Sequence, residues 1–209
     1  FTKLSHAITP EQLVEGLDVM FNTFDRLADK HGCEKIKTIG DCYMVVAGLP
    51  ERCEDHVLRL TAMALDMQHA IENFPDILAG GSIRIRIGMH TGSVVAGIIG
   101  KNKFSYDLWG DAVNTASRME SHGEPGKIHV TEEFLKKLFM ERNEWLMVNG
   151  EWLIEEANDS SSFTINDSPL TNNDSPFTIN HLPFTIIPRG EMDIKGKGKM
   201  KTYFMEKKR

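Results

Sequence analysis

A single aspartate stands at a tight turn between two short segments that alternate polar and apolar residues. The turn is Gly40-Asp41, and it separates residues 35–39 from residues 42–47. This pattern predicts a β-hairpin with the Asp41 carboxylate projecting from a rigid backbone. An exposed carboxylate so placed can bind a metal ion, although aspartate is also favoured in turns for conformational reasons alone.

A second pair of polar residues is spaced for one face of a helix. Residues 112–121 have helical periodicity, and Gly110 or Asp111 can cap them. Asn114 and Arg118 are four residues apart and therefore share a face. An amide and a guanidinium together can bind ribose and phosphate oxygens. The simpler alternative is a solvent-facing polar pair.

Lysine and glycine alternate near the C-terminal end of the chain. Residues 194–199 read Ile-Lys-Gly-Lys-Gly-Lys, which predicts a flexible, donor-rich loop that could hold phosphate. It is not a Walker loop, because no Gly-Lys-Ser/Thr opens a helix there. Residues 189–209 contain eight Lys or Arg and three Asp or Glu, a balance of +5 within a net charge of -6. A solvated basic turn remains the plain alternative.

Helices and short strands must position these groups. A helix should begin at Thr9-Pro10, which supply an N-cap and a first helical residue, and end at Gly32. Further helices are expected over residues 54–78 and 132–140. Strands are expected over four more segments: residues 83–89, 93–100, 127–130 and 201–205. Residues 93–100 are rich in small residues, so this strand should be buried. This mixture, hairpins included, predicts an α+β fold with helices on one face of a sheet.

Residues 158–185 break this pattern, because they contain no Lys, Arg or Glu. A Phe-Thr or Leu-Thr unit recurs every seven residues within them, and prolines recur at the same interval. Regular prolines exclude a helix, and Asn, Asp, Ser and Pro favour turns. We therefore expect a low-complexity loop insertion that projects from the domain.

The composition is that of an ordinary globular protein: 209 residues, 41% of them hydrophobic and 26% charged. The net acidity argues against nucleic acid as a partner. Three cysteines without metal-like spacing (33, 42 and 53) predict a reducing compartment rather than disulfides or zinc. No apolar run approaches the roughly 18 residues that span a membrane. The start at Phe1-Thr2 predicts a fragment of a longer protein.

Taken together, these segments resemble the catalytic domain of class III nucleotidyl cyclases, the adenylyl and guanylyl cyclases. The resemblance covers nearly the whole chain except residues 158–185. It implies a ferredoxin-like α+β domain with a mostly antiparallel sheet and helices packed on it, formed by residues 1–209 as one domain. The matching motifs occur in the family's order: Phe1-Thr2, residues 34–44, 47–50, 86–92 with 96–97, 106–119, 195–198 and 201–204.

The resemblance implies an active site shared by two subunits that pair head to tail. In the family, two aspartates of one subunit bind two Mg²⁺ or Mn²⁺ ions. Asp41 matches the second aspartate. The first precedes the family's Phe-Thr, so it would lie upstream of Phe1 and Thr2, which match the turn that cradles phosphates. Residues 1–209 alone are therefore expected to be weakly active or inactive, and a non-catalytic partner domain is one alternative.

Two further positions bear on the nucleotide base. Adenylyl cyclases generally carry Lys and Asp where guanylyl cyclases typically carry Glu and Cys, and this chain has Lys37 and Asp107. A Lys ammonium can donate to adenine N1, and an Asp carboxylate can accept from the exocyclic amine. The resemblance thus implies ATP as substrate and cyclic AMP with pyrophosphate as products. A guanylyl cyclase is the alternative.

The remaining site residues also follow from the resemblance. Asn114 and Arg118 match catalytic residues that orient the ribose and stabilise charge on the reacting phosphate. Lys195 matches the lysine on the terminal phosphate, with Lys197 as the near alternative, and Lys127 is a weaker match to a phosphate-binding residue. Because one chain carries Asp41 and this whole set, we expect a homodimer with two equivalent sites. The domain should act in intracellular signal transduction on the cytoplasmic side, within a parent protein that can be membrane-anchored.

Overall fold

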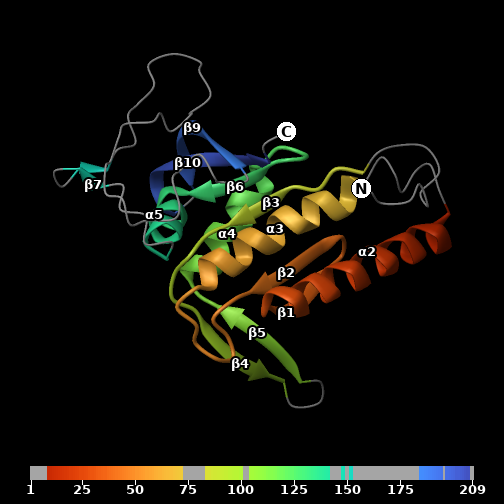
Figure 1. Ribbon diagram of the computed structural model, residues 1–209. Coiled ribbons are helices and arrows are strands. Elements are labelled where there is room, and N and C mark those ends of the chain that lie inside the picture. The colour runs from red at the N-terminus through yellow and green to blue at the C-terminus, as the bar shows by residue number, and fades with distance from the viewer. Residues whose placement is uncertain are drawn as a thin grey trace. The chain divides into compact units, whose positions relative to one another are not determined.

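The computed structural model describes residues 9–72, 83–100, 104–141, 147–148, 151–152, 184–194 and 196–207. The chain divides into two compact units. The first comprises Phe1–Ile85 and Gly92–Val113, and the second comprises Arg86–Thr91 and Asn114–Arg209. Each unit has its own helices and strands (Figure 1).

Helix α2 (Pro10–His31) of the first unit begins and ends where the sequence predicts. The Thr9 side chain accepts a hydrogen bond from the Gln12 amide at 3.3 Å, and the Gln12 side chain accepts one from the Thr9 amide at 3.1 Å. This reciprocal box satisfies amides that the first helical turn leaves free. Gly32 ends the helix in the left-handed conformation, with φ of 62°.

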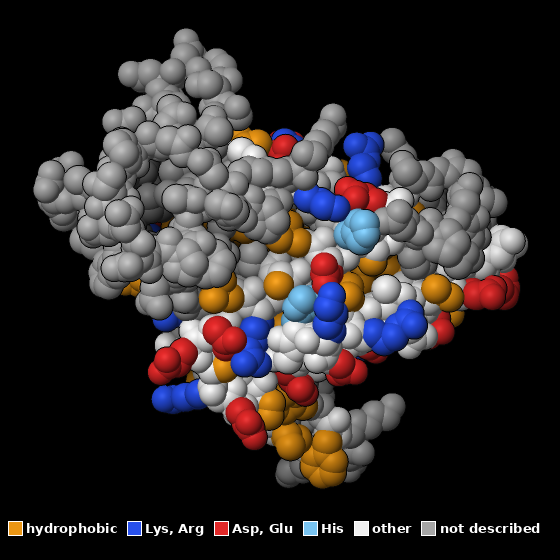
Figure 2. Space-filling model, viewed as in Figure 1, with side chains coloured by type: hydrophobic (Ala, Val, Ile, Leu, Met, Phe, Trp, Pro, Cys, Tyr) orange, Lys and Arg blue, Asp and Glu red, His pale blue; other side chains and the backbone are white. Residues whose placement is uncertain are grey.

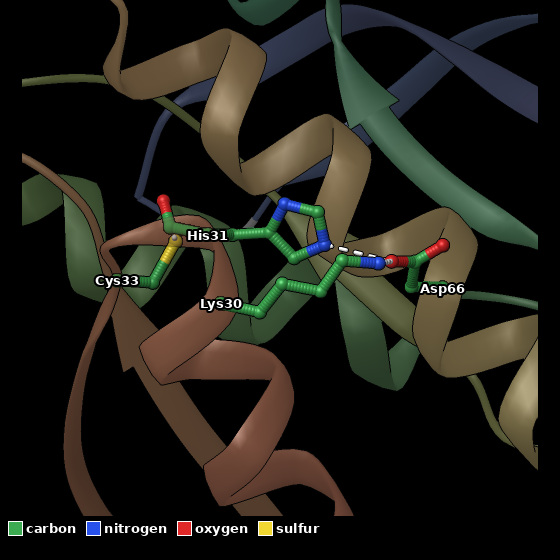
Figure 3. Close-up of polar contacts among 4 residues, drawn as sticks. All are labelled: Lys30, His31, Cys33 and Asp66. Carbon is green, nitrogen blue, oxygen red and sulfur yellow. Dashed lines mark hydrogen bonds and ion pairs between the residues drawn. The ribbon is translucent and has the colours of Figure 1, made fainter.

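Helix α3 (His56–Glu72) packs along α2. Figure 3 shows Lys30 and His31, at the end of α2, both pointing toward Asp66 of α3. Their nitrogen atoms lie 2.7 and 2.8 Å from the same Asp66 oxygen. Burial alone would raise the pKa of Asp66, but hydrogen bonds from Lys30 and His31 outweigh it and lower that pKa. The sequence predicts this helix over residues 54–78. It begins two residues later, at His56, and residues 73–78 lie outside the described part of the chain.

Two antiparallel hairpins complete the first unit. Strands β1 (Glu34–Ile39) and β2 (Cys42–Val46) are joined by the predicted Gly40-Asp41 turn, in which Gly40 has φ of 61°. Strands β4 (Val95–Ile99) and β5 (Ser105–Trp109) form the second hairpin. β1 packs against β5, so the two hairpins bring residues distant in sequence into contact.

The expectation that residues 93–100 form a buried strand is wrong about burial. Val95 and Ile98 of β4 are each 68% exposed, and Ile99, Phe104 and Trp109 are also exposed. In Figure 2 apolar side chains gather at the lower edge of the molecule, over the β4–β5 hairpin of Figure 1. Small and apolar residues suggested a core strand, but no other element of the described chain covers this side of the hairpin.

The second unit is built on four strands: β3 (Ile87–Met89), β6 (Ile128–Thr131), β9 (Phe184–Ile194) and β10 (Gly198–Lys207). They form one sheet in the order β3-β6-β10-β9. Only the β3–β6 pair is parallel among the strands that the structure describes. Helix α5 (Glu132–Glu141) packs on β6 and β10 and buries Phe134, Leu135 and Leu138.

Two sequence expectations need correction in this unit. The strand expected over residues 83–89 is shorter than predicted, because only its last three residues form strand β3. Strand β9 begins inside the expected loop insertion, because Phe184 is buried and pairs with Lys207 of β10. The rest of residues 158–185 lies outside the described residues. Two short strands, β7 (Met147–Val148) and β8 (Glu151–Trp152), were not expected.

The three cysteines are free thiols: Cys33 is buried, Cys42 exposed and Cys53 half-buried. Burial raises the pKa of the Cys33 thiol to about 11, so it is protonated at neutral pH. None of the described helices is both long and apolar enough to cross a membrane.

Candidate functional site

Lys37 and Asp107 form an ion pair that joins β1 to β5. The Lys37 ammonium nitrogen lies 2.5 Å from Oδ2 of Asp107. The other carboxylate oxygen, Oδ1, accepts a hydrogen bond from the Leu108 amide at 2.8 Å. The two residues that the sequence singles out for base recognition are therefore in direct contact, although 70 positions separate them.

The two side chains carry opposite charges and are partly exposed to solvent. The Lys37 and Asp107 side chains are 33% and 21% exposed. The hydrogen bond from Lys37, followed by the one from the Leu108 amide, holds the pKa of Asp107 below its ordinary value. Near neutral pH the site thus presents an ammonium with unused donors beside an ionised carboxylate.

Asp41 is exposed at the tip of the β1–β2 hairpin, as predicted. It shares this hairpin with Lys37, which lies opposite Met44 in the register. The described residues contain no group of three or more His, Cys, Asp or Glu side chains that could hold a metal ion. Asp41 can therefore serve as one ligand of a metal site only if other ligands, such as phosphate oxygens, complete the coordination.

Helix α4 (Asp111–Ser121) carries Asn114 and Arg118. Both are exposed, one helical turn apart, whereas Ala112, Thr115 and Met119 are buried. The turn before the helix requires glycine, because Gly110 has φ of 151° and an added Cβ would lie 3.0 Å from the Ser93 carbonyl oxygen. α4 therefore presents an amide and a guanidinium to solvent, one helical turn apart.

Sequence reasoning missed how closely α4 approaches strand β3. A Cβ at Gly88 would lie 2.0 Å from the Glu120 amide nitrogen and 2.6 Å from the Ala116 carbonyl oxygen. Arg86, two residues earlier, forms an ion pair with Glu120 at 2.8 Å. The available signal was a glycine inside an alternating strand, which often marks close approach of another backbone.

The other residues predicted to bind phosphate differ in their contacts and in whether the structure describes them. Lys127 is engaged within the second unit, where its ammonium lies 3.0 Å from Glu124 and 3.1 Å from Glu206. Lys197 is exposed in the turn between β9 and β10. Phe1, Thr2 and Lys195 lie outside the described residues.

The sequence matches one known protein family and several of its members. The family model described as the adenylate and guanylate cyclase catalytic domain matches residues 1–166. Guanylate cyclase soluble subunit beta-2 of Rattus norvegicus is 37% identical over 205 residues, 98% of this chain and 24% of that protein. An adenylate cyclase of Mycobacterium bovis is 46% identical over 138 residues, 66% of this chain and 31% of that protein. The chain thus spans only 24% and 31% of the length of these two relatives.

A solved structure gives the same result for the fold. The catalytic core of a rhodopsin-guanylyl cyclase with converted specificity, in complex with ATPalphaS, superposes with a TM-score of 0.73 at 31% identity. The match covers 100% of this chain and 90% of that one. The predicted α+β class is confirmed, and the relatives include both adenylate and guanylate cyclases. The chain belongs to the family of adenylate and guanylate cyclase catalytic domains.

Proposed function

We propose that this chain is the catalytic domain of an adenylyl cyclase, which converts ATP into 3′,5′-cyclic AMP and pyrophosphate in intracellular signal transduction. The observation that carries the choice of ATP is the contact between Lys37 and Asp107. An ammonium beside a carboxylate offers a donor and an acceptor at neighbouring points. Adenine needs this pattern, because its N1 accepts a hydrogen bond and its exocyclic amine donates one.

Guanine has the opposite pattern at the same edge, a carbonyl oxygen and a ring N–H. Lys37 would face the ring N–H with another donor, and Asp107 would face the carbonyl with another acceptor. A base that leaves polar groups unpaired in its site is disfavoured by up to several orders of magnitude. The residues on the two strands thus favour ATP over GTP.

Asp41 fits one ligand of a shared Mg²⁺ or Mn²⁺ site. It is an exposed carboxylate on a two-residue turn, the type of oxygen ligand that these hard cations prefer. The triphosphate and a second carboxylate would supply the other ligands. When bound, such ions lower the pKa of the attacking hydroxyl and offset charge on the phosphoryl oxygens.

The protein's own side chains orient the substrate and neutralise charge. In the proposed reaction the ribose 3′-hydroxyl attacks the α-phosphorus in line, and pyrophosphate leaves as negative charge accumulates on the phosphoryl oxygens. Asn114 binds the ribose and Arg118 binds the reacting phosphate, both from the exposed side of α4. Lys195, with Phe1 and Thr2, is proposed to contact the rest of the triphosphate.

We further propose a head-to-tail homodimer with two equivalent sites. Its support is the apolar side of the β4–β5 hairpin, where Val95, Ile98 and Ile99 are more than half exposed. Exposed apolar patches of this kind mark surfaces that bind another protein. A second copy would cover the hairpin and bring a second set of site residues.

Two alternatives remain specific enough to test. A guanylyl cyclase is favoured by the 37% identity to the rat soluble guanylate cyclase subunit over 98% of the chain. A non-catalytic partner domain would retain the fold without activity. The test is an assay of the native-length protein with ATP or GTP, in Mg²⁺ and in Mn²⁺, over a range of protein concentrations. Cyclic AMP formation that rises more steeply than linearly with protein supports the proposal, and either cyclic GMP as main product or no product in any condition rejects it.

A further inference from the structure

His129 of β6 is fully buried, and the proposed reaction does not use it. Its side chain has no exposed surface, and its Nδ1 lies 2.7 Å from the carbonyl oxygen of Met119 in α4. A carbonyl oxygen only accepts hydrogen bonds, so Nδ1 must carry the proton of the neutral ring. The imidazole therefore donates across the second unit, from a strand to a helix.

The Met119 carbonyl oxygen, which His129 binds, lies in the last turn of α4 and lacks the usual hydrogen bond from an amide four residues later. Within a continuing helix the Gly123 amide would donate to the Met119 oxygen, but here it donates to Glu120 at 2.9 Å. The last carbonyls of a helix need other donors when they are buried. His129 thus acts as a C-terminal cap for α4 that comes from the next strand in the chain, β6.

Arg189 of β9 also lies against the imidazole. Its Nη1 lies 3.4 Å from Nε2 and 3.5 Å from Nδ1 of His129, and it donates to the carbonyl oxygen of His122, just beyond α4. Since Nδ1 carries the proton, only Nε2 has a lone pair that can accept from Arg189. The rings of His129 and Phe204 lie 5.0 Å apart, and the Arg189 guanidinium lies 5.0 Å from the Phe204 ring. The neutral imidazole therefore connects β6, β9 and the end of α4.

We propose that His129 is a positioning residue for Arg118, because its cap on the neighbouring Met119 fixes the last turn of α4 and with it the direction of the Arg118 side chain. This inference rests on the proposed function, in which Arg118 stabilises the reacting phosphate. Met119 is fully buried and Arg118 is exposed. The helix turn that carries both lies against two paired residues of neighbouring strands, His129 of β6 and Gly88 of β3.

Protonation of His129 would weaken this arrangement. A doubly protonated ring keeps the Nδ1 donor but turns Nε2 into a second donor facing Arg189. The charged and titratable groups around the ring are Arg189 on β9, His122 and Glu124 after α4, and Lys127, which pairs with Glu124 and with Glu206 of β10. The nearest of these is a cation, so the charged ring is disfavoured.

Leucine and asparagine at position 129 form a matched pair for the test. The two side chains have similar shapes, but only the asparagine amide can donate from the place that Nδ1 occupies. In the native-length protein, His129→Leu should lower kcat for ATP about tenfold with KM changed less than about twofold, because a slightly misplaced transition-state contact costs rate. His129→Asn should recover most of the loss. In an Arg118→Ala background His129→Leu should have no further effect, whereas in a Lys37→Ala background its full effect should remain.

Hydrogen exchange gives a readout that needs no activity. His129→Leu should speed exchange of the His122 and Gly123 amides, while His129→Asn and the amides of the β4–β5 hairpin should stay close to the unsubstituted protein. The proposal is overturned if exchange at the end of α4 is unchanged in His129→Leu. It is also overturned if the kcat loss persists undiminished without Arg118, or if asparagine is as impaired as leucine. If the unsubstituted protein forms no cyclic nucleotide, the proposed function fails, and the exchange comparison still decides whether His129 caps the helix.

Discussion

The Lys37 ammonium nitrogen lies 2.5 Å from the Asp107 carboxylate, and this contact joins the two hairpins of the first unit. The pairing uses one of three ammonium protons on Lys37 and leaves lone pairs free on Asp107, whose second oxygen also accepts from the Leu108 amide. Both side chains can therefore bind a purine edge without first separating. A donor and an acceptor already held in place lose little conformational freedom when the base binds.

Exchange of this pair should change the preferred base. The double substitution Lys37→Glu with Asp107→Cys replaces the adenine pattern with an acceptor that can serve the ring N–H of guanine. We expect the ratio of kcat/KM for ATP to that for GTP to fall by about 100-fold or more. The measurement is steady-state kinetics with each nucleotide.

Lys35 supplies the control for that exchange. It lies on the same strand and pairs with Asp25 at 2.7 Å, and Asp25 also accepts a hydrogen bond from Tyr43. Lys35→Glu should leave the ATP to GTP ratio unchanged. An undiminished preference for ATP in the double variant would show that the base is recognised elsewhere.

Neutralisation of Asp41 should abolish most of the metal-dependent rate. Asp41→Asn keeps the shape of the exposed turn residue but removes its charge, so the fold should be unaffected. We expect kcat to fall about 100-fold, because metal ions supply several kcal/mol of stabilisation in such reactions. Rates are measured across Mg²⁺ and Mn²⁺ concentrations. Glu34→Gln, exposed on the same hairpin, is the matched control and should retain full activity; comparable losses in both variants would contradict a specific role for Asp41.

A charge on the apolar hairpin should separate the proposed subunits. Ile98→Glu places a carboxylate on a residue that is 68% exposed, so the folded subunit should tolerate it. The dimer dissociation constant should rise about tenfold or more, as measured by analytical ultracentrifugation, with a parallel loss of activity. Val14→Glu on α2 is the control, since Val14 is 65% exposed. A dimer that survives Ile98→Glu, or one lost equally in both variants, would exclude this hairpin as the interface.

A methyl group on β3 should displace α4. The Cβ of Gly88→Ala would lie 2.0 Å from the Glu120 backbone nitrogen, a contact that only backbone movement can relieve. We expect the free energy of unfolding to fall by about 1–3 kcal/mol, as for other overpacked positions, in urea denaturation. At Gly97 the corresponding Cβ would lie 3.2 Å from the Trp109 side chain, which can move. Gly97→Ala should therefore cost clearly less, and equal costs would argue against the close approach of α4 to β3.

Stability should also depend on the ionisation of His129. Burial, reinforced by Arg189 and partly offset by the hydrogen bond to Met119, lowers the pKa of His129 below its ordinary value of 6.5. Between the lowered value and 6.5 the unfolded chain binds more protons than the folded one. The free energy of unfolding should therefore rise with pH across this window and level off above it.

Urea denaturation of the unsubstituted protein and of His129→Asn at several pH values measures this dependence. The asparagine variant should lack the part of the slope that lies below pH 6.5. Equal slopes in the two proteins would mean that His129 does not change its proton binding on folding.

The local features of the first unit could be predicted from the sequence because each depends on neighbouring residues. Thr9, Pro10 and Gln12 determine the start of α2, and Gly40-Asp41 determines the β1–β2 turn. The resemblance to the cyclase family singled out Lys37 and Asp107, although nothing in their spacing could place them in contact.

Other features depend on how separate elements of the fold pack together, and there the sequence was insufficient. The small and apolar residues of β4 suggested burial, but burial depends on whether another element covers the strand, and Ile98 is exposed. Strand β9 begins in a low-complexity segment whose composition favours turns, and pairing with β10 overrides that preference. The cap by His129 joins two consecutive elements, but it depends on how β6 packs beside the end of α4, and no local pattern marks such a contact.

A competition assay tests the central claim most directly. The native-length protein is given equal concentrations of ATP and GTP in one reaction, and cyclic AMP and cyclic GMP are quantified together. The ratio of the two initial rates equals the ratio of the two kcat/KM values, independent of enzyme concentration. Recognition of adenine by Lys37 and Asp107 predicts cyclic AMP in at least about tenfold excess. Equal products, or cyclic GMP in excess, would contradict it.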